Sequence, residues 1–238
     1  MEEARLVATD VVLGSGRRLF LNQVSVLVGA GQMVAVTGPS GSGKTSLLSV
    51  LGGLVRPRSG TVSYGGGPVG SLDGEPRRGT AFILQTYGLV PTLTVEENVA
   101  IGLRARSVNG PDATARALLA LDRVGIAELA DRLVDELSGG QLQRVAVARA
   151  LVVEPDVLLA DEPTSELDEG TRDHVVRELR AEADRGALVV VATHDPEVAD
   201  LCDLEVKLDE GKVERTVEPV AVEPGHEHDL FKPPPRST

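Results

Sequence analysis

The chain has 238 residues, with 36 acidic and 24 basic side chains and a formal net charge of −12 at pH 7. This balance argues against general nucleic-acid binding, because such proteins gain affinity by neutralising phosphates. Hydrophobic residues make up 42% and aromatic residues 2%, so we expect a globular core of Val, Leu, Ala and Ile. The single cysteine, Cys202, permits no internal disulfide. No apolar run approaches the roughly 18 residues of a membrane helix, so we expect no direct membrane insertion.

The N-terminal third alternates short β-strands with turn residues. Residues 5–36 are rich in strand formers, and a glycine-rich loop follows over 38–43. Residues 45–51 predict a helix, 60–79 predict turns with two short strands, and 80–84 predict a buried strand. The strands expected before the loop are 5–8, 24–28 and 33–36.

The rest of the chain changes from helical to α/β in character. Residues 92–136 are rich in Ala, Leu, Arg and Glu at helical spacing, which predicts an inserted helical subdomain. Residues 157–160 and 188–192 are continuous apolar runs, typical of parallel strands covered on both faces. Residues 171–185 predict an amphipathic helix between them, and 204–217 predict a terminal β-hairpin.

The glycine-rich loop fits the pattern G-x-x-x-x-G-K-[S/T] of phosphate-binding loops. Its glycines let backbone N–H groups converge on phosphate oxygens, and the next helix presents its N-terminus to the same anion. We expect Lys44 to reach the β- and γ-phosphates of a nucleotide and the Thr45 hydroxyl to bind Mg²⁺. The nucleotide-binding residues predicted here are Gly38, Pro39, Ser40, Gly41, Ser42, Gly43, Lys44, Thr45 and Ser46.

The apolar strand 157–160 ends in two acids, Asp161 and Glu162. An aspartate at this strand end is placed to hold Mg²⁺ through water. The following glutamate can act as a general base on the attacking water. Together with the loop, this pattern predicts a P-loop nucleoside triphosphatase.

A third motif narrows the type of nucleoside triphosphatase. Residues 137–141 read Leu-Ser-Gly-Gly-Gln and precede a helical stretch to Leu151. A serine and two glycines that open a helix can bind a phosphate. The motif resembles the signature of ATP-binding cassette (ABC) ATPases. The residues that the resemblance assigns to nucleotide binding are Ser138, Gly139, Gly140 and Gln141.

The resemblance covers nearly the whole chain and implies further roles. Gln85 matches the Q-loop glutamine, a ligand of Mg²⁺ and water, and Asp168 lies in a segment that resembles the D-loop at the dimer interface. His194 matches the switch histidine that contacts the γ-phosphate. In this family two cassettes enclose two ATP molecules, so the expected partners include a second copy. The catalytic residues expected are Glu162, His194, Lys44 and Gln85.

The segment 85–99 resembles the Q-loop region of one subfamily, which includes lipoprotein-release, macrolide- and peptide-efflux and cell-division cassettes. This resemblance implies a separate membrane permease that contacts Tyr87, Leu89 and Pro91. The alternative is that these apolar side chains seal the helical subdomain onto the core, and both roles can coexist.

Two positions depart from the family. Many cassettes stack adenine on an aromatic residue where this chain has Leu13, which predicts weaker nucleotide affinity and poor discrimination between ATP and GTP. Arg17 or Arg18 is an alternative reader of the base. Glu166 stands where the family often has Ala, and the segment 165–168 does not match the D-loop of the efflux members.

The expected architecture is therefore an α/β P-loop core of ABC type, with a mainly parallel sheet, an antiparallel β subdomain and an inserted helical subdomain. The predicted function is ATP binding and hydrolysis that energise export or extraction by a permease, at the cytoplasmic face of the cell membrane. Mechanical signalling through a membrane partner and a soluble ABC ATPase without transport are the alternatives. The predicted divisions are an ATPase domain over 1–217, its core over 1–85 and 151–217, its helical part over 86–150, and a flexible tail over 218–238.

Overall fold

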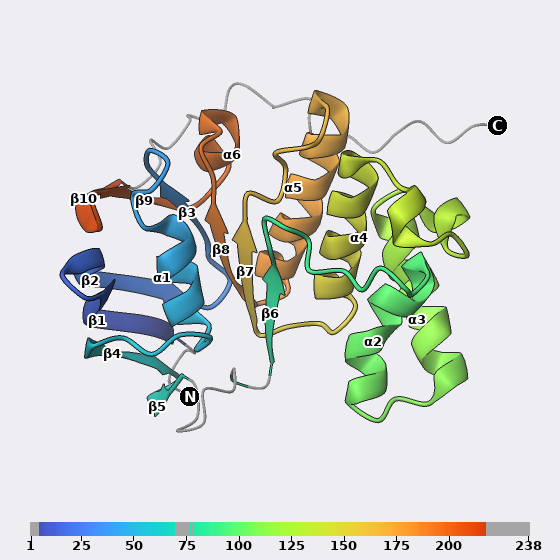
Figure 1. The fold of residues 1–238 in the computed structure, drawn as a ribbon, viewed down its shortest axis with the longest axis horizontal. Coiled ribbons are helices and arrows are strands. Elements are labelled where there is room, and N and C mark those ends of the chain that lie inside the picture. The colour runs from blue at the N-terminus through green and yellow to red at the C-terminus, as the bar shows by residue number, and fades with distance from the viewer. Residues whose placement is uncertain (1–4, 70–76, 78, 218–238) are drawn as a thin grey trace.

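The computed structural model describes residues 5–69, 77 and 79–217, so the predicted tail lies outside the described residues. A six-stranded sheet in the order β10-β9-β3-β8-β7-β6 runs through the centre of the molecule (Figure 1). Neighbouring strands in the part of the sheet with the order β9-β3-β8-β7-β6 pair in parallel, and β10 pairs with β9 antiparallel. Its strands are β3 (Met33–Thr37), β6 (Thr80–Ile83), β7 (Val157–Asp161), β8 (Leu188–Ala192), β9 (Leu204–Asp209) and β10 (Lys212–Val217).

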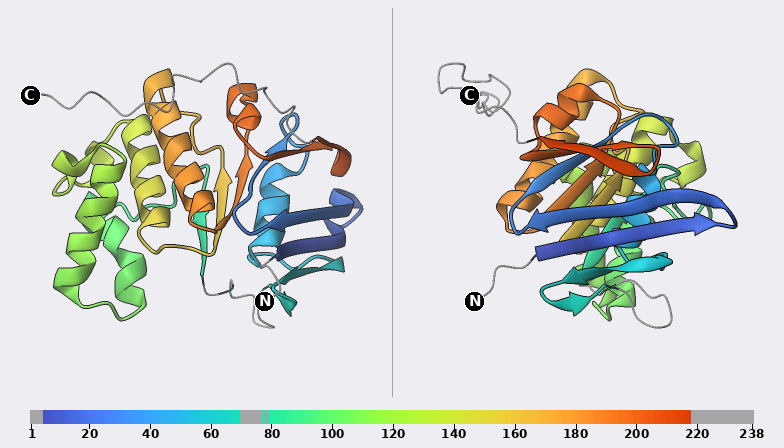
Figure 2. Two further views of the ribbon diagram at one scale, coloured as in Figure 1. Left: turned by 180° about the vertical axis from the view of Figure 1, so that it is seen from behind. Right: turned by 90° about the vertical axis from the view of Figure 1, so that its left-hand side faces the viewer.

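A second, antiparallel sheet has the order β2-β1-β4-β5. Its strands β1 and β2 are longer than the sequence predicted, because Ser15 pairs with Arg18 and continues the ladder into a hairpin. Figure 2 shows this sheet at one end of the molecule. Its strands are β1 (Arg5–Ser15), β2 (Arg18–Gly29), β4 (Ser59–Tyr64) and β5 (Gly67–Pro68).

Helices and two short 3-10 turns make up the remaining regular structure. Thr94, Asn109, Ser138 and Asp168 each accept a backbone N–H of the following helix through the side chain, which explains where those helices begin. The predicted helical stretch over 92–136 contains α2, α3 and two short 3-10 turns. The helices are α1 (Lys44–Leu51), α2 (Val95–Ala105), α3 (Gly110–Arg123), α4 (Gly139–Leu151), α5 (Glu169–Asp184) and α6 (Pro196–Asp200).

The six-stranded sheet separates two apolar clusters. Alternate residues of β3, such as Met33 and Val34, enter opposite clusters. One cluster joins the sheet to α1 and the antiparallel sheet, and the other joins it to α2–α5. Every residue of β7 and β8 is buried as a result, which confirms the prediction of parallel strands covered on both faces.

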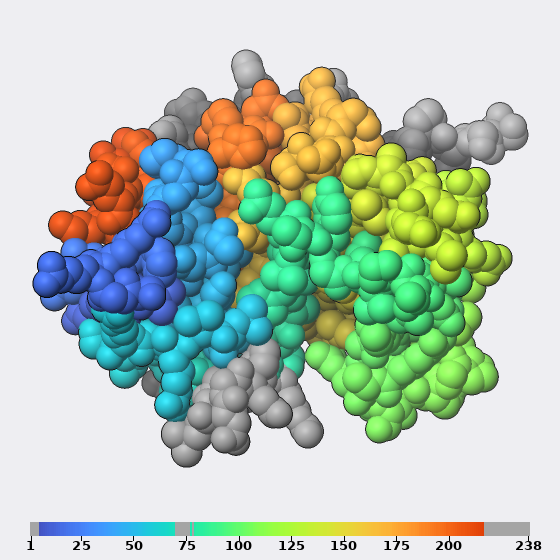
Figure 3. Space-filling view, viewed as in Figure 1, coloured from blue at the N-terminus to red at the C-terminus, as the bar shows by residue number. Residues whose placement is uncertain are grey.

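This arrangement brings several functional loops to one edge of the sheet. The strands β3, β8, β7 and β6 are parallel, so their carboxyl ends lie at the same edge of the sheet. Ligands of open α/β sheets bind at this edge. The segment after β6, green in Figure 3, lies at the centre of one face between α1 and the helices α2–α4. Within the described residues, no helix is long and apolar enough to cross a membrane.

Candidate active site

The loop between β3 and α1 adopts a conformation that requires glycine. Gly38 has a φ of 137°, and a Cβ there would lie 2.1 Å from the backbone oxygen of Leu208. Gly43 has a φ of 109°, and a Cβ there would lie 2.6 Å from the oxygen of Phe20. The loop therefore wraps back onto the start of α1. Lys44 closes it, since its Nζ donates to the backbone oxygens of Gly38 at 2.8 Å and Pro39 at 3.3 Å.

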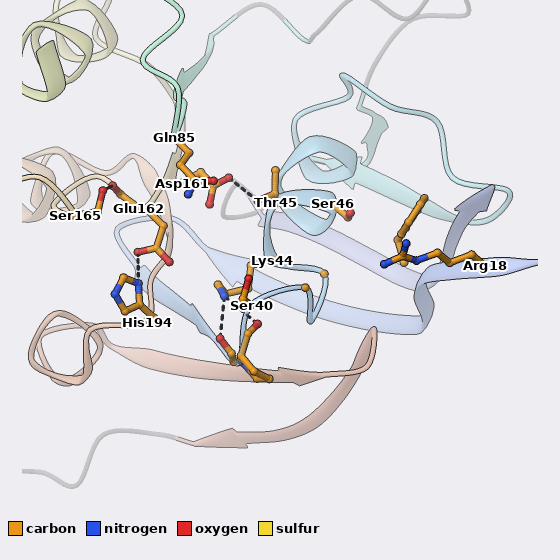
Figure 4. A pocket seen from close by; sticks show the side chains of 15 residues that line it. Arg18, Ser40, Lys44, Thr45, Ser46, Gln85, Asp161, Glu162, Ser165 and His194 are labelled. Atoms are coloured by element: carbon orange, nitrogen blue, oxygen red, sulfur yellow. Dashed lines mark hydrogen bonds and ion pairs between the residues drawn. The ribbon is translucent and has the colours of Figure 1, made fainter. Parts of the chain in front are cut away.

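The end of β7 meets the start of α1 at two oxygen-bearing side chains. Thr45 Oγ1 donates a hydrogen bond to Asp161 Oδ2 at 2.6 Å (Figure 4). Burial raises the pKa of Asp161, and the charge of the adjacent Glu162 adds to this, against the opposing effects of Thr45 and Lys44. Gln85 faces the same region from the end of β6 (Figure 4).

Glu162 occupies a strained backbone position. Its φ is 50°, a region that residues other than glycine adopt rarely, and its backbone N–H donates to Ala192 O at 2.8 Å. The turn directs its carboxylate to His194, whose Nδ1 lies 2.9 Å from Glu162 Oε2. Glu162 is 8% exposed, so β7 and β8 present a buried carboxylate beside an imidazole.

One cavity of about 590 Å³ joins these groups. Its walls combine the glycine-rich loop, two acidic side chains, an amide, an imidazole and a lysine, which suits a polyphosphate with an associated cation. Ser42 is buried inside the loop rather than at the cavity wall. The predicted site residues that line the cavity are Gly38, Pro39, Ser40, Gly41, Gly43, Lys44, Thr45, Ser46, Gln85, Asp161, Glu162 and His194.

The signature residues lie elsewhere on the chain. Ser138 is exposed and caps α4: its N–H donates to Gln141 Oε1 at 2.9 Å, and its Oγ accepts from Gln141 N at 3.4 Å. Asp168 caps α5 through Thr171, whose backbone and hydroxyl donate to its carboxylate and lower its pKa. Ser138, Gly139, Gly140, Gln141 and Asp168 all belong to the described part of the chain, yet none lines this cavity.

Two cavity residues, Phe20 and Ser165, were not predicted to contact the nucleotide, and Arg18 was named only as an alternative reader of the base. The Arg18 guanidinium carbon lies 5.6 Å from the centroid of the Phe20 ring, so β2 brings an aromatic ring and a cation to the cavity. Leu13, the expected contact for the base, is partly buried, packs against the core and is not among the described lining residues. Because aromatic residues make up only 2% of the chain, an aromatic residue in the strands before the phosphate loop stands out as a candidate base contact, and this signal could have indicated Phe20.

Comparison with known proteins decides the family. Residues 21–165 match the family model described as ABC transporter. The chain belongs to the ABC transporter family. An uncharacterized ABC transporter ATP-binding protein of Mycobacterium tuberculosis is 42% identical over 193 residues, which are 79% of this chain and 58% of that protein. The chain therefore spans less than two thirds of the length of this relative.

Other ABC proteins match over more of their length. The lipoprotein-releasing system ATP-binding protein LolD of Bordetella pertussis is 40% identical over 207 residues, 84% of this chain and 90% of LolD. The dimeric structure of MJ0796, a bacterial ABC transporter cassette, superposes with a TM-score of 0.84 at 32% identity and covers 90% of this chain and 99% of its own. A post-hydrolysis dimer of MJ0796 bound to ADP and Pi gives a TM-score of 0.82 at 31% identity, with the same coverage.

The segment that follows β6 in this ABC cassette is held by one arginine. Arg149 on α4 donates to the backbone oxygens of Tyr87 at 2.6 Å and Gly88 at 2.5 Å. Burial raises the pKa of Tyr87, and the nearby Glu166 carboxylate adds to this. Leu89 packs partly buried against the helical core, whereas Pro91 is exposed. The segment thus combines an inward apolar side chain with an exposed end.

Proposed function

We propose that this chain is the ATP-binding and ATP-hydrolysing subunit of an ABC transporter. The observation that carries the proposal is the meeting of Glu162 and His194 in the cavity that Lys44 and the glycine-rich loop also line. A positioned base beside a phosphate loop supports hydrolysis rather than binding alone. The ADP- and Pi-bound structure of a similar cassette supports the same activity.

In the proposed reaction, loop N–H groups and the Lys44 ammonium bind the β- and γ-phosphates. Glu162 accepts a proton from a water whose oxygen attacks the γ-phosphorus, and the bond from that phosphorus to the β,γ-bridging oxygen breaks to release ADP and phosphate. His194 holds the Glu162 carboxylate in place through the 2.9 Å contact. The oxygens of Thr45, Asp161 and Gln85 suit Mg²⁺, which would neutralise phosphate charge when bound.

The proposal includes a second copy of the chain. Ser138 and the adjoining glycines are exposed or half-buried at the start of a helix, and they face no part of their own cavity. A helix start of this kind suits a phosphate supplied by another subunit. The dimeric MJ0796 cassette supports this arrangement.

We also propose a separate membrane permease as a partner, contacted near Tyr87, Leu89 and Pro91 on the cytoplasmic face of the membrane. The similarity to a lipoprotein-releasing ATP-binding protein supports export or extraction of a substrate. The two alternatives, mechanical signalling through a membrane protein and a soluble ATPase, use the same cavity and differ in the partner.

Capture from solubilised native membranes in the presence of ATP distinguishes these functions. We expect the tagged chain to retain a multi-helix permease, and Tyr87→Ala to lower both capture and permease-stimulated hydrolysis while sparing basal hydrolysis. Leu119→Ala is the matched control, because Leu119 is a 67% exposed apolar residue on α3. A partner with few helices and a large extracytoplasmic domain would indicate efflux or signalling. Recovery from the soluble fraction alone would contradict the transporter proposal.

A further inference from the structure

A cluster of one arginine and three carboxylates lies next to the Glu162–His194 pair. Arg172 on α5 donates from Nη1 to Asp195 Oδ2 at 3.3 Å, from Nη2 to Glu197 Oε2 at 2.5 Å and from Nε to Asp173 Oδ1 at 3.2 Å. The Arg172 side chain is 19% exposed, whereas the side chain of its partner Glu197 is 68% exposed. The cluster joins α5 to α6, which lie side by side in Figures 1 and 2.

The position of Asp195 makes this cluster relevant to the active site, because it directly follows His194. On the other side of the histidine, Thr193 is fully buried, and its N–H donates to Val36 O at 3.0 Å. Thr193 Oγ1 also accepts the N–H of Asp195 at 3.0 Å. The turn that carries His194 is thus tied to β3 at its start and, through Arg172, to α5 at its end.

The His194 side chain itself receives little support from packing. It is 70% exposed, and its Nδ1 contacts the Glu162 carboxylate. A second cavity of about 340 Å³ lies beside this pair and is lined by Glu162, Ser165, Arg172 and His194, among others. Loss of the arginine would enlarge this space next to the imidazole and release the charged end of the turn.

We propose that Arg172 is a positioning residue for hydrolysis, which holds the His194 turn through Asp195 and Glu197 and so keeps the imidazole on Glu162. Ion pairs near a surface contribute little to stability, so the main consequence of the cluster is geometric. Displacement of a catalytic group by about 1 Å can lower a rate by roughly a hundredfold. The inference rests on the proposed ATPase function.

Steady-state ATPase kinetics and imidazole NMR of the full chain test this role together. For Arg172→Ala we expect kcat to fall about tenfold with the KM for ATP within about twofold, because phosphate binding by Lys44 is untouched. Arg172→Lys should recover part of the loss. The His194 imidazole resonance, assigned by its absence in His194→Ala, should shift or broaden in Arg172→Ala.

Arg180→Ala is the matched control. Arg180 lies on the same helix and binds Asp203 Oδ2 at 2.8 Å and Leu201 O at 2.9 Å, so it also ties α5 to the chain beyond α6 but not to the His194 turn. We expect its kcat and His194 resonance to match wild type. Equal losses of kcat in the two alanine variants, or an unchanged His194 resonance in Arg172→Ala, would overturn the proposal.

Asp195→Asn provides a second route if Arg172→Ala does not fold. An asparagine keeps an oxygen for the α6 cap, where Asp195 Oδ1 accepts from Glu197 N at 2.9 Å, but weakens the bond to Arg172. A smaller fall in kcat with the same NMR change supports the proposal, and wild-type behaviour in both measurements contradicts it. The NMR measurement needs no turnover, so absence of ATPase activity in the wild type would contradict the proposed function without deciding the role of Arg172.

Discussion

His194 Nδ1 lies 2.9 Å from Glu162 Oε2, although the two residues are 32 positions apart in the chain. Two adjacent parallel strands, β7 and β8, bring them together, because Asp161 pairs with Ala192 at the last step of the ladder. The strained φ of 50° at Glu162 then turns its carboxylate toward the imidazole. The sheet therefore brings the proposed base and the imidazole together.

Substitution of Asp161 should separate stability from function. Burial raises the pKa of this carboxyl above its ordinary value, so ionisation of the side chain costs more free energy in the folded chain than in the unfolded chain. We expect Asp161→Asn to raise the Tm of the nucleotide-free protein at pH 7, because an amide avoids this cost, yet to abolish Mg²⁺-dependent hydrolysis.

The pH dependence of this effect has a definite sign. A raised pKa in the folded state means that protonation favours folding, so wild type gains relative to Asp161→Asn as the pH falls through that pKa. Thermal unfolding at several pH values should show the Tm difference shrinking toward acid. A wild type more stable than Asp161→Asn at pH 7 would contradict this account.

Phe20 should contribute to nucleotide affinity. Stacking of a base on an aromatic ring is worth about 1–3 kcal/mol, so Phe20→Ala should weaken ATP binding by roughly 5- to 150-fold. Leu13→Ala is the control, because Leu13 packs against the core and not at the cavity. Titration with fluorescent ATP measures both, and a larger loss in Leu13→Ala would restore the base contact first expected from the sequence.

The same ring bears on base selectivity. Stacking is tolerant of base identity, so we expect ATP and GTP to bind Phe20→Ala and wild type with similar ratios. Competition of GTP against labelled ATP measures this ratio. A strong preference for ATP that disappears in Arg18→Ala would show instead that the arginine beside the ring distinguishes the bases.

Ser138 should act on the nucleotide of a second copy. We expect Ser138→Glu to leave ATP affinity of the monomer within about twofold and to abolish both dimerisation and hydrolysis, because a carboxylate would face the phosphates. Ser107→Glu, at an exposed turn between α2 and α3, is the matched control. Loss of ATP binding by monomeric Ser138→Glu would mean that the serine contacts nucleotide in its own chain.

Local patterns predicted most of the core and the phosphate loop. The apolar runs at 157–160 and 188–192 became β7 and β8 because buried parallel strands require continuous apolar sequence. The helix α6 was not predicted, since its five residues, Pro196–Asp200, are too few for a helical hydrophobic period to be visible. The lengths of β1 and β2 were underestimated for a related reason: tertiary pairing, not local pattern, extends the hairpin across Ser15 and Arg18.

Site residues that belong to a contiguous motif could be predicted from the sequence. Site residues that reach the cavity only through the pairing of distant strands could not. The loop residues and Asp161 follow from spacing and strand context. The presence of Phe20 at the cavity depends on how β2 passes the loop, where a Cβ on Gly43 would lie 2.6 Å from Phe20 O. The ion pair between Arg172 and Asp195 joins α5 to a loop 23 residues later in the chain. Hydrophobic periodicity in the sequence gives no indication of such a contact.

The central claim is that Glu162 is the base in an ATP-hydrolysing dimer, and Glu162→Gln tests it most directly. Glutamine keeps the size of the side chain but cannot accept the proton, so we expect hydrolysis to fall by at least about a hundredfold while ATP remains bound. Size-exclusion chromatography with ATP should show the variant as a dimer that retains ATP and the wild type returning to monomer as ATP is consumed. Near-normal hydrolysis by Glu162→Gln would contradict the assignment of the base.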